Sequence, residues 1–269
     1  MNKIVGIIGC GWLGLPLAKE LLNSGYRVKG TTTSNAKMDT LKREGIEGFH
    51  INLNEDGITG QIQNFLEGLH ILIVNVPPGL RGDNPENYVS KMKSLLKEIQ
   101  KASVKHIVFV SSTSVYGNVE GEITEAVAPR PISESGKQLL RSEKLFSEVK
   151  TLNTAIIRFG GLIGEDRHPI HHLAGKSGLK NGEELVNLIH RKDCIHIIKT
   201  ILEKNYWNSI FNGVYPLHPS KKEYYTNEAI KRGLLKPIFE KSAEKIVKRC
   251  VVCKNFLNNN NFLYTSIIS

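Results

Sequence analysis

The chain has 269 residues, of which 40% are hydrophobic and 23% are charged, as in an ordinary globular protein that buries its own core. Lysine and arginine outnumber aspartate and glutamate by 36 to 26, which gives a formal net charge of +10. The four cysteines are too scattered for a disulfide framework, and no apolar run approaches the ~18 residues of a membrane span. We therefore expect a cytoplasmic protein with no membrane partner.

The positive charge is concentrated near the C-terminus, because residues 217–254 hold ten Lys/Arg and four Asp/Glu. One interpretation is a well-charged, soluble surface. The other is attraction to a small-molecule substrate that is phosphorylated or nucleotide-linked. Nucleic acid is not expected as a partner, since the chain shows no helix-turn-helix, zinc-finger or RNP pattern. Cys250 and Cys253 form a lone C-x-x-C, which we interpret as core or strand residues because a structural zinc site needs four ligands.

The first 160 residues alternate strand-like and helix-like patterns, which predicts an α/β fold of the Rossmann type, a doubly wound parallel sheet. Strands are expected at Ile4–Ile8, Tyr26–Thr31, Phe49–Leu53, His70–Val76, Lys105–Ser111 and Thr154–Phe159. Helices are expected at Trp12–Ser24, Asn35–Glu44, Pro85–Ala102 and Ser133–Val149. The last two are the faces at which we expect a homodimer interface.

The pattern changes after Gly164, where loops rich in Gly, Pro and His follow. Helical spacing returns in Glu183–Leu202, and a basic, partly helical segment covers Lys221–Lys248. The tail Asn255–Ser269 is expected to be a strand or a loose end. We therefore divide the chain into a dinucleotide-binding domain, residues 1–164, and a mainly substrate-binding C-terminal lobe, residues 165–269, with a diffuse boundary.

A glycine motif follows the first expected strand. Gly9, Gly11 and Gly14 give G-x-G-x-x-G between a strand and a helix, which is the context of a dinucleotide-binding fingerprint. Gly9 allows the tight turn, Gly11 allows the backbone to approach a pyrophosphate, and Gly14 allows close packing of helix on strand. The N–H groups at the start of the helix, including those of Trp12 and Leu13, would bind the phosphates.

The end of the second expected strand bears on the choice between NADP and NAD. An NAD site usually places an acidic residue about 20 residues after the glycines to bind the ribose 2′-OH. The first acid here is Asp39, and the preceding stretch is hydroxyl-rich, with Lys37 close by and Thr31, Thr33 and Ser34 among its members. Hydroxyl and ammonium donors suit a 2′-phosphate. This pattern favours NADP, although no arginine is present and a plain threonine-rich turn is the alternative.

A second motif, Ser111–Gly117 (S-S-T-S-V-Y-G), stands at the carboxyl end of the fifth expected strand. With the fingerprint it resembles the extended short-chain dehydrogenase/reductase family, which includes the NAD-dependent epimerase/dehydratases. Residues 158–164 and 187–193 resemble that family's R-x-x-x-x-x-G and N-x-I-H-x-x-D segments. Residues 211–225 are most similar to its atypical YeeZ-like subgroup. The resemblance implies NADP or NAD as cofactor and implies a set of cofactor-binding residues: Gly9, Gly11, Trp12, Leu13, Gly14, Thr31, Thr33, Ser34, Pro77 and Ser111.

The resemblance is incomplete at two places. The family's usual G-x-x-G-x-x-G has a glycine where this chain has Ile8. Its chemistry rests on Tyr-x-x-x-Lys, and Lys137 matches the lysine only if Ser133 occupies the tyrosine position. A serine hydroxyl cannot do the acid–base work of that tyrosine near neutral pH. Ser112 matches the family's active-site Ser/Thr, so the resemblance implies Ser112 and Lys137 as catalytic residues.

Four other residues are candidates for the missing acid–base group: Tyr116, His168, His171 and His172. No carboxylate stands at a suitable spacing beside the paired histidines, so no metal site is predicted. Three functions stay open at this point. The first is an NAD(P)-dependent oxidoreductase or a sugar-nucleotide epimerase/dehydratase-like enzyme without the usual tyrosine. The second is a non-catalytic NAD(P)-binding sensor or regulator, and the third is an α/β protein that binds another nucleotide.

Overall fold

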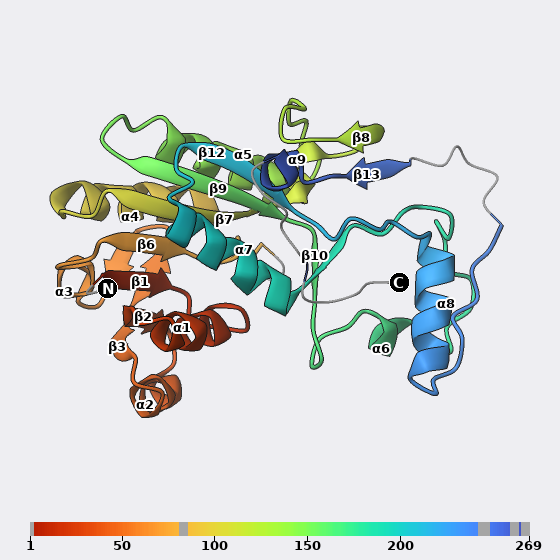
Figure 1. Cartoon of the computed structure of the whole chain (residues 1–269), viewed down its shortest axis with the longest axis horizontal. Helices are drawn as coiled ribbons and strands as arrows, with labels where there is room; N and C mark the ends of the chain where they lie inside the picture. The colour runs from red at the N-terminus through yellow and green to blue at the C-terminus, as the bar shows by residue number, and fades with distance from the viewer. Residues whose placement is uncertain (1–2, 81–85, 242–247, 259–263, 265–269) are drawn as a thin grey trace.

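The computed structural model describes residues 3–80, 86–241, 248–258 and 264. Its centre is a seven-stranded sheet with the strand order β12-β9-β7-β6-β1-β2-β3, in which every pair is parallel (Figure 1). The strands are β1 (Ile4–Ile8), β2 (Arg27–Thr32), β3 (Glu47–His50), β6 (Ile71–Val74), β7 (His106–Ser112), β9 (Asn153–Phe159) and β12 (Ser209–Gly213). The predicted Rossmann-type doubly wound sheet is confirmed.

Helices cover both faces of the sheet. One face packs against α1 (Gly14–Asn23), α2 (Asn35–Arg43) and α7 (Arg191–Lys204), and the other against α3 (Ile62–Leu66), α4 (Tyr88–Lys101) and α5 (Glu134–Ser147). Side chains alternate along each strand, so Ile7 and Ile73 face the first layer while Ile8 and Val74 face the second. Both faces are buried, as a parallel sheet requires.

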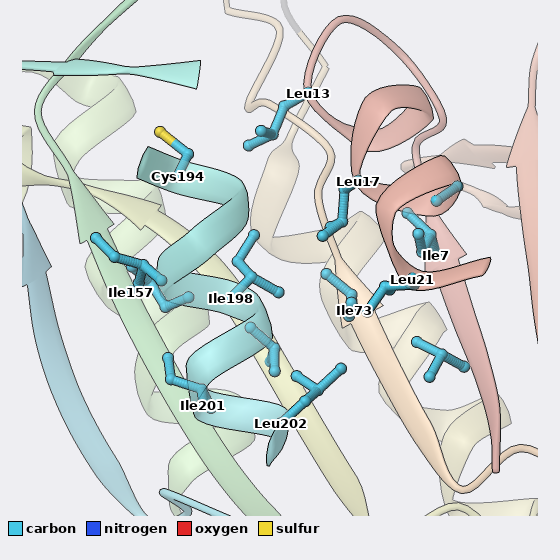
Figure 2. Packing of buried hydrophobic residues seen from close by; sticks show 14 of the residues in the cluster. Ile7, Leu13, Leu17, Leu21, Ile73, Ile157, Cys194, Ile198, Ile201 and Leu202 are labelled. Atoms are coloured by element: carbon cyan, nitrogen blue, oxygen red, sulfur yellow. The ribbon is translucent and has the colours of Figure 1, made fainter. Parts of the chain in front are cut away.

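Packing between α1 and α7 fixes the start of α1 over the sheet. Leu17 and Leu21 of α1 pack in one cluster with Ile198 and Leu202 of α7 and Ile73 of β6 (Figure 2). All five side chains are at most 2% exposed. The helix that follows the glycine motif is therefore held by a close-packed layer and presents its N-terminus at a fixed place.

The smaller elements lie mostly beyond the carboxyl ends of the strands, at one side of the molecule (Figure 1). They are β4 (Asn52–Asn54), β5 (Gly57–Thr59), η1 (Thr113–Tyr116), β8 (Gly121–Ile123), β10 (Gly161–Ile163), α6 (Ile170–Leu173), β11 (Leu188–His190), α8 (Lys221–Lys231), β13 (Arg249–Val251) and α9 (Lys254–Asn258). A third core, around Tyr224 and Tyr225, belongs to α6, α8 and the β10–β11 pair.

The division at residue 164 needs a correction. The chain after it builds the lobe around α6 and α8, but α7 and β12 return to the central sheet, where β12 pairs with β9. The β12 strand was missed because its sequence, Ser209–Gly213, is short and contains a polar asparagine. A cut at residue 164 would therefore remove an edge strand and a covering helix from the Rossmann unit.

Several predicted boundaries also differ. The third strand is Glu47–His50 and not Phe49–Leu53, since residues 52–54 turn away to pair with β5. The spacing in Glu183–Leu202 is helical only from Arg191, because residues 188–190 pair with β10. The helix in Lys221–Lys248 ends at Lys231, and α9 occupies the start of the predicted tail. Residues 242–247, 259–263 and 265–269 and Pro85 lie outside the described residues.

Two further observations bear on the composition-based predictions. Within the described ranges, no helix combines the length and apolar character required to cross a membrane. All four cysteines are free: Cys10, Cys194 and Cys253 are buried, and Cys250 is partly exposed on β13. Cys250 and Cys253 thus lie in or directly after a strand, without a bond between them.

Candidate functional site

A cavity of about 410 Å³ opens at the carboxyl ends of β1, β6 and β7, bounded by α5 and by the loop after β10. In a doubly wound sheet this is the edge at which ligands bind, beside the point where the strand order reverses. The cavity brings together seven of the residues expected from the sequence: Gly9, Gly11, Trp12, Leu13, Pro77, Ser111 and Ser112.

The glycine turn has the geometry that its sequence predicts. Gly9 has φ of +96°, and a Cβ there would lie 2.5 Å from the Asn75 carbonyl oxygen. A Cβ on Gly14 would lie 2.1 Å from the Gly9 carbonyl oxygen, so the turn closes only with glycine at both positions. A Cβ on Gly11 would meet no atom within 4 Å, which leaves that backbone open toward the cavity.

Two side chains from neighbouring strands hold the turn in place. The Gly9 N–H donates to Thr31 Oγ1 over 3.1 Å, and Asn75 Nδ2 donates to the Gly9 carbonyl over 3.1 Å. Thr31 is 3% exposed and does not line the cavity, so its hydroxyl supports the turn. Asn75 was missed from the sequence, although a polar residue at the end of the apolar run His70–Val76 was a usable signal.

The start of α1 is suited to a phosphate group. Leu13, at the N-cap, makes no side-chain capping hydrogen bond, and the first turn contains no acidic residue. Within α1 the Leu15 N–H donates to the Gly11 carbonyl and Pro16 has no N–H, so the groups that an anion at the cavity would meet are the N–H groups of residues 11–13 and the positive end of the helix dipole. With the open backbone at Gly11, these features fit the pyrophosphate of a dinucleotide, which Gly11, Trp12 and Leu13 would hold.

The hydroxyl groups at the end of β2 have two different surroundings: some are hydrogen-bonded inside the protein and others are not. Thr31 serves the glycine turn, and Thr32 Oγ1 accepts from the Ser34 N–H over 3.2 Å. Thr33 is exposed, and Ser34 is the N-cap of α2 without a side-chain capping bond. Neither lines the 410 Å³ cavity, and Lys37 is exposed one turn into α2.

Ser111 and Ser112 reach the cavity from the end of β7 but differ in their partners. Ser111 Oγ donates to Glu143 Oε1 over 2.5 Å, so its proton is engaged inside the protein. Ser112 Oγ accepts from the Ser114 N–H over 3.2 Å, which leaves its own O–H to donate to a ligand. Of the two hydroxyls, Ser112 is the one placed to bind a substrate oxygen.

A buried polar network lies behind Ser111. Glu143 of α5 and Arg158 of β9, each 2% exposed, form a bidentate ion pair with a shortest distance of 2.6 Å. Arg158 also donates to the Tyr116 hydroxyl over 2.9 Å, and that hydroxyl donates to Asn212 Oδ1 over 2.8 Å. Burial raises the pKa of Tyr116, and its hydroxyl is fully committed, so it does not replace the missing catalytic tyrosine.

The start of α5 does not place the expected catalytic pair in the cavity. Ser133 is exposed at the N-cap, where its Oγ accepts from the Gly136 N–H over 3.1 Å. Lys137 is exposed and is not among the cavity residues, whereas Leu139, 4% exposed, is. The helix thus turns its Leu139 side toward the cavity. A Tyr-x-x-x-Lys spacing that ends at this position would begin at Ser135, so neither register supplies the family's pair.

The histidines of the loop after β10 are also away from the cavity. His168 is 5% exposed in the lobe core, where Nδ1 accepts from the Ile170 N–H and Nε2 donates to the Tyr224 hydroxyl over 2.9 Å. Burial and the Arg232 guanidinium lower the pKa of His168 to about 4, so its ring is neutral at physiological pH. His171 and His172 are exposed on α6. Among the described residues, no group of three or more His, Cys, Asp or Glu could hold a metal ion.

A second cavity, of about 350 Å³, is lined by residues next in the chain to those of the first. Thr113 and Gly161 line it, and their chain neighbours Ser112 and Leu162 line the first cavity. It is polar and carries two cations. Lys221 pairs with Glu184 over 2.6 Å, and the Arg249 guanidinium donates to the Gly117 carbonyl. Burial raises the pKa of Tyr225, which also lines this cavity, to about 12, so that phenol is not a base near neutral pH.

The chain matches a known family and several known proteins. A family model described as NAD(P)H-binding matches residues 9–205. The protein YeeZ of Escherichia coli K12 is 30% identical over 256 residues, 93% of each chain. A protein called uncharacterized UDP-glucose epimerase YtcB, from Bacillus subtilis, is 25% identical over 75% of this chain and 73% of its own.

Solved structures share the fold at low identity. The UDP-glucuronic acid 4-epimerase of Bacillus cereus in complex with NAD superposes with a TM-score of 0.81 at 18% identity, over 99% of this chain and 93% of that one. MoeE5 with UDP-glucuronic acid and NAD gives 0.78 at 20% identity, over 98% and 94%. At such identity these two structures support the fold alone.

The sheet, the glycine turn and the family match together define an NAD(P)-binding protein of the Rossmann type. More specifically, the chain belongs to the short-chain dehydrogenase/reductase-like NAD-dependent epimerase family, in which YeeZ is its relative at 30% identity. The resemblance read from the sequence is thus confirmed at the level of the family.

Proposed function

We propose that the protein is an NADP-dependent oxidoreductase that reduces the carbonyl group of a small, polar, anionic substrate. The observation that carries this proposal is that Ser112 and Leu162, which line the first cavity, are the chain neighbours of Thr113 and Gly161, which line the second. A cofactor held at Gly11 and a substrate held beside Thr113 would meet at Ser112 and Leu162. The bound nicotinamide supplies the hydride, and the protein supplies position and electrostatics.

The side chains around the first cavity favour reduction over oxidation. None of its lining residues is a His, Tyr, Lys, Asp or Glu, so no side chain there acts as a base near neutral pH. A sugar-nucleotide epimerase must remove a proton from a hydroxyl, which needs such a base. A reductase needs only a proton for the developing alkoxide, and Ser112 can donate a hydrogen bond to that oxygen while water supplies the proton.

The second cavity supports an anionic substrate. Arg249 is partly buried against Gly117 and stays charged despite the lowering of its pKa by burial. Glu184, which also lines this cavity, pairs with Lys221, so Arg249 supplies the net positive charge. Thr113 and Asn118 are further polar lining residues. Relatives and structural neighbours carry names that refer to UDP-sugars, and a nucleotide-linked or phosphorylated substrate for this chain is part of the proposal.

The preference for NADP rests on the end of β2. Thr33 and Ser34 carry hydroxyl groups that do not support the glycine turn. They lie at the N-terminus of α2, and Lys37 follows one turn later. No acidic residue occupies the position that would hold a ribose 2′-OH, and a carboxylate there would repel a 2′-phosphate. The structural neighbours with a bound cofactor contain NAD. The choice between NADP and NAD is therefore tested by comparing the binding of NADPH and NADH.

The experiment is a screen of carbonyl compounds, phosphorylated and not, with NADPH and with NADH, following absorbance of the reduced cofactor. We expect turnover with NADPH, and we expect Ser112→Ala to lower kcat with little change in the affinity for NADPH. Ser114→Ala, a neighbouring hydroxyl absent from the cavity, is the matched control. Equal activity of Ser112→Ala and the wild type would refute the role of Ser112.

A second candidate function has its own observation. The absence of any acid–base side chain among the residues around the first cavity is also what a non-catalytic NAD(P) sensor would show. Such a protein would bind reduced and oxidised cofactor with different affinities and consume neither. Isothermal titration with NADPH and NADP⁺ measures that difference, and a protein that binds both yet reduces no compound of the screen would favour the sensor.

A further inference from the structure

The loop that follows β10 lies over the glycine turn and carries a guanidinium to the cavity. Residues 164–167 form a tight turn closed by two backbone hydrogen bonds, from Gly164 N–H to the Arg167 carbonyl (2.9 Å) and from Arg167 N–H to the Gly164 carbonyl (3.2 Å). Arg167 lines the same 410 Å³ cavity as Gly11 and Leu13. The backbone of Arg167 is therefore fixed next to the open part of the glycine motif.

Trp12 joins the glycine turn to this loop. Its indole Nε1 donates to Asp166 Oδ1 over 3.0 Å, and a Cβ on Gly164 would come within 2.9 Å of the indole ring. Two guanidiniums also lie near the ring, with Arg167 Cζ 5.0 Å and Arg191 Cζ 4.8 Å from its centre. These are distances for cation–π attraction, so Trp12 orients both arginines.

The two guanidiniums on Trp12 differ in charge balance. Arg191 forms ion pairs with Glu165 over 3.3 Å and with Asp166 over 3.1 Å. Arg167 forms no ion pair with any described residue, and it alone of the two lines the cavity. The acidic side chains of the turn are thus paired with Arg191, and Arg167, which is exposed, keeps its positive charge where it lines the cavity.

We propose that Arg167 binds the pyrophosphate of the cofactor, and that Trp12 is the residue that positions it. This inference rests on the proposed cofactor site. Backbone N–H groups at Gly11 and the helix dipole provide partial charges only, whereas a guanidinium provides a full charge in a geometry that matches phosphate oxygens. In this proposal the pyrophosphate contacts both the glycine motif and Arg167, which belongs to a loop some 150 residues away in the sequence.

The test compares ligands that differ in the pyrophosphate. Binding of ADP-ribose and of adenosine is measured by isothermal titration for the wild type, Arg167→Gln and Lys19→Gln. Lys19 is the charge-matched control, since it is an exposed cation of α1 paired with Glu44 outside the cavity. We expect Arg167→Gln to weaken ADP-ribose about tenfold and to leave adenosine unchanged, because one charge-assisted contact is lost. Lys19→Gln should leave both ligands unchanged.

The positioning role of Trp12 has a separate readout. Trp12→Phe keeps an aromatic face for Arg167 but loses the bond to Asp166, and Trp12→Leu loses both. We expect the affinity for ADP-ribose to fall in that order, and the Arg167→Gln change to cost less in the Trp12→Leu background than in the wild type. Additive effects of the two changes would show that Trp12 does not act through Arg167.

The outcomes separate the inference from the proposed function. If the wild type binds ADP-ribose and Arg167→Gln binds it within twofold as tightly, the arginine contact is wrong and the cofactor site stands. If the folded wild type binds neither ADP-ribose nor NADPH, the cofactor site itself is wrong, and the inference falls with it. A loss of adenosine binding equal to that of ADP-ribose would also overturn the inference, because it would place Arg167 elsewhere on the ligand.

Discussion

Two regions of the cavity wall, the turn Gly9–Gly14 and the start of α5 at residues 133–139, relate differently to the family pattern. The turn is made by backbone conformation, and its glycines lie where G-x-G-x-x-G predicts. At the start of α5 the expected pair points elsewhere: Ser133 caps the helix, Lys137 is exposed, and Leu139 faces the cavity. The first region thus has the geometry that its glycine spacing predicts, whereas the second presents Leu139, and neither Ser133 nor Lys137, to the cavity.

The largest expected effect concerns how α5 is held against the sheet. Glu143→Leu leaves Arg158 buried without a counter-charge, and we expect it to lower the free energy of unfolding by about 3–5 kcal/mol. Chemical denaturation measures the change. The double variant Glu143→Leu/Arg158→Met removes both charges and should recover most of the loss. A single variant as stable as the wild type would mean that the ion pair does not fix α5.

The next effect separates two glycines of the turn. A methyl group on Gly14 must displace the Gly9 carbonyl, and we expect Gly14→Ala to destabilise the protein by about 2–3 kcal/mol. Gly11→Ala meets open space, so its stability should stay within about 1 kcal/mol of the wild type while its affinity for NADPH falls. Thermal unfolding and NADPH titration of both variants decide the point. The reverse pattern would contradict the roles assigned to the two positions.

A smaller effect is expected at the N-cap of α5. Ser133→Ala removes the hydrogen bond to the Gly136 N–H and should cost about 1 kcal/mol of stability. The affinity for NADPH and the rate of any turnover should not change, because Ser133 does not line the cavity. Ser133→Asp, another good capping residue, is the control that should retain stability. A fall in turnover without a fall in stability would give Ser133 a catalytic role.

The smallest effect is expected at Lys137. Its side chain is exposed and does not line the cavity. Lys137→Ala should therefore leave the free energy of unfolding unchanged and change the affinity for NADPH by less than about twofold. Fluorescence titration measures the affinity. A tenfold loss of NADPH binding would show that Lys137 reaches the cofactor, and the register that places Leu139 toward the cavity would then need revision.

The comparison also shows what a sequence can predict. The alternation of buried strands with helices was enough to predict the fold class. The glycine turn could be predicted from the spacing of three glycines, because its conformation depends on the backbone and not on contacts of side chains. The start of α5 was harder, because a shift of two residues turns a helical side chain by about half a turn and Lys137 offered a plausible match. Residues joined only by the fold, such as Arg158 with Glu143 or Trp12 with Arg167, had no local signal.

The return of the chain to the central sheet after residue 164 was not predicted, for a related reason. The β12 strand is five residues long and pairs with β9, more than fifty residues earlier, so its place at the edge of the sheet depends on a contact that no local pattern reports. Thr31 shows the same limit on a smaller scale. Its place in a hydroxyl-rich stretch suggested a cofactor ligand, yet its hydroxyl accepts from Gly9 and supports the turn from inside.

The most direct measurement is a titration of the purified protein with NADPH and, separately, with NADH, following nicotinamide fluorescence. The account predicts saturable binding of NADPH that is tighter than that of NADH, competition by ADP-ribose, and loss of affinity in Gly11→Ala. A preference for NADH would contradict the role of Thr33 and Ser34 and leave the cavity in place. Binding of neither cofactor by the folded protein would contradict the central claim that the turn Gly9–Gly14 holds a dinucleotide.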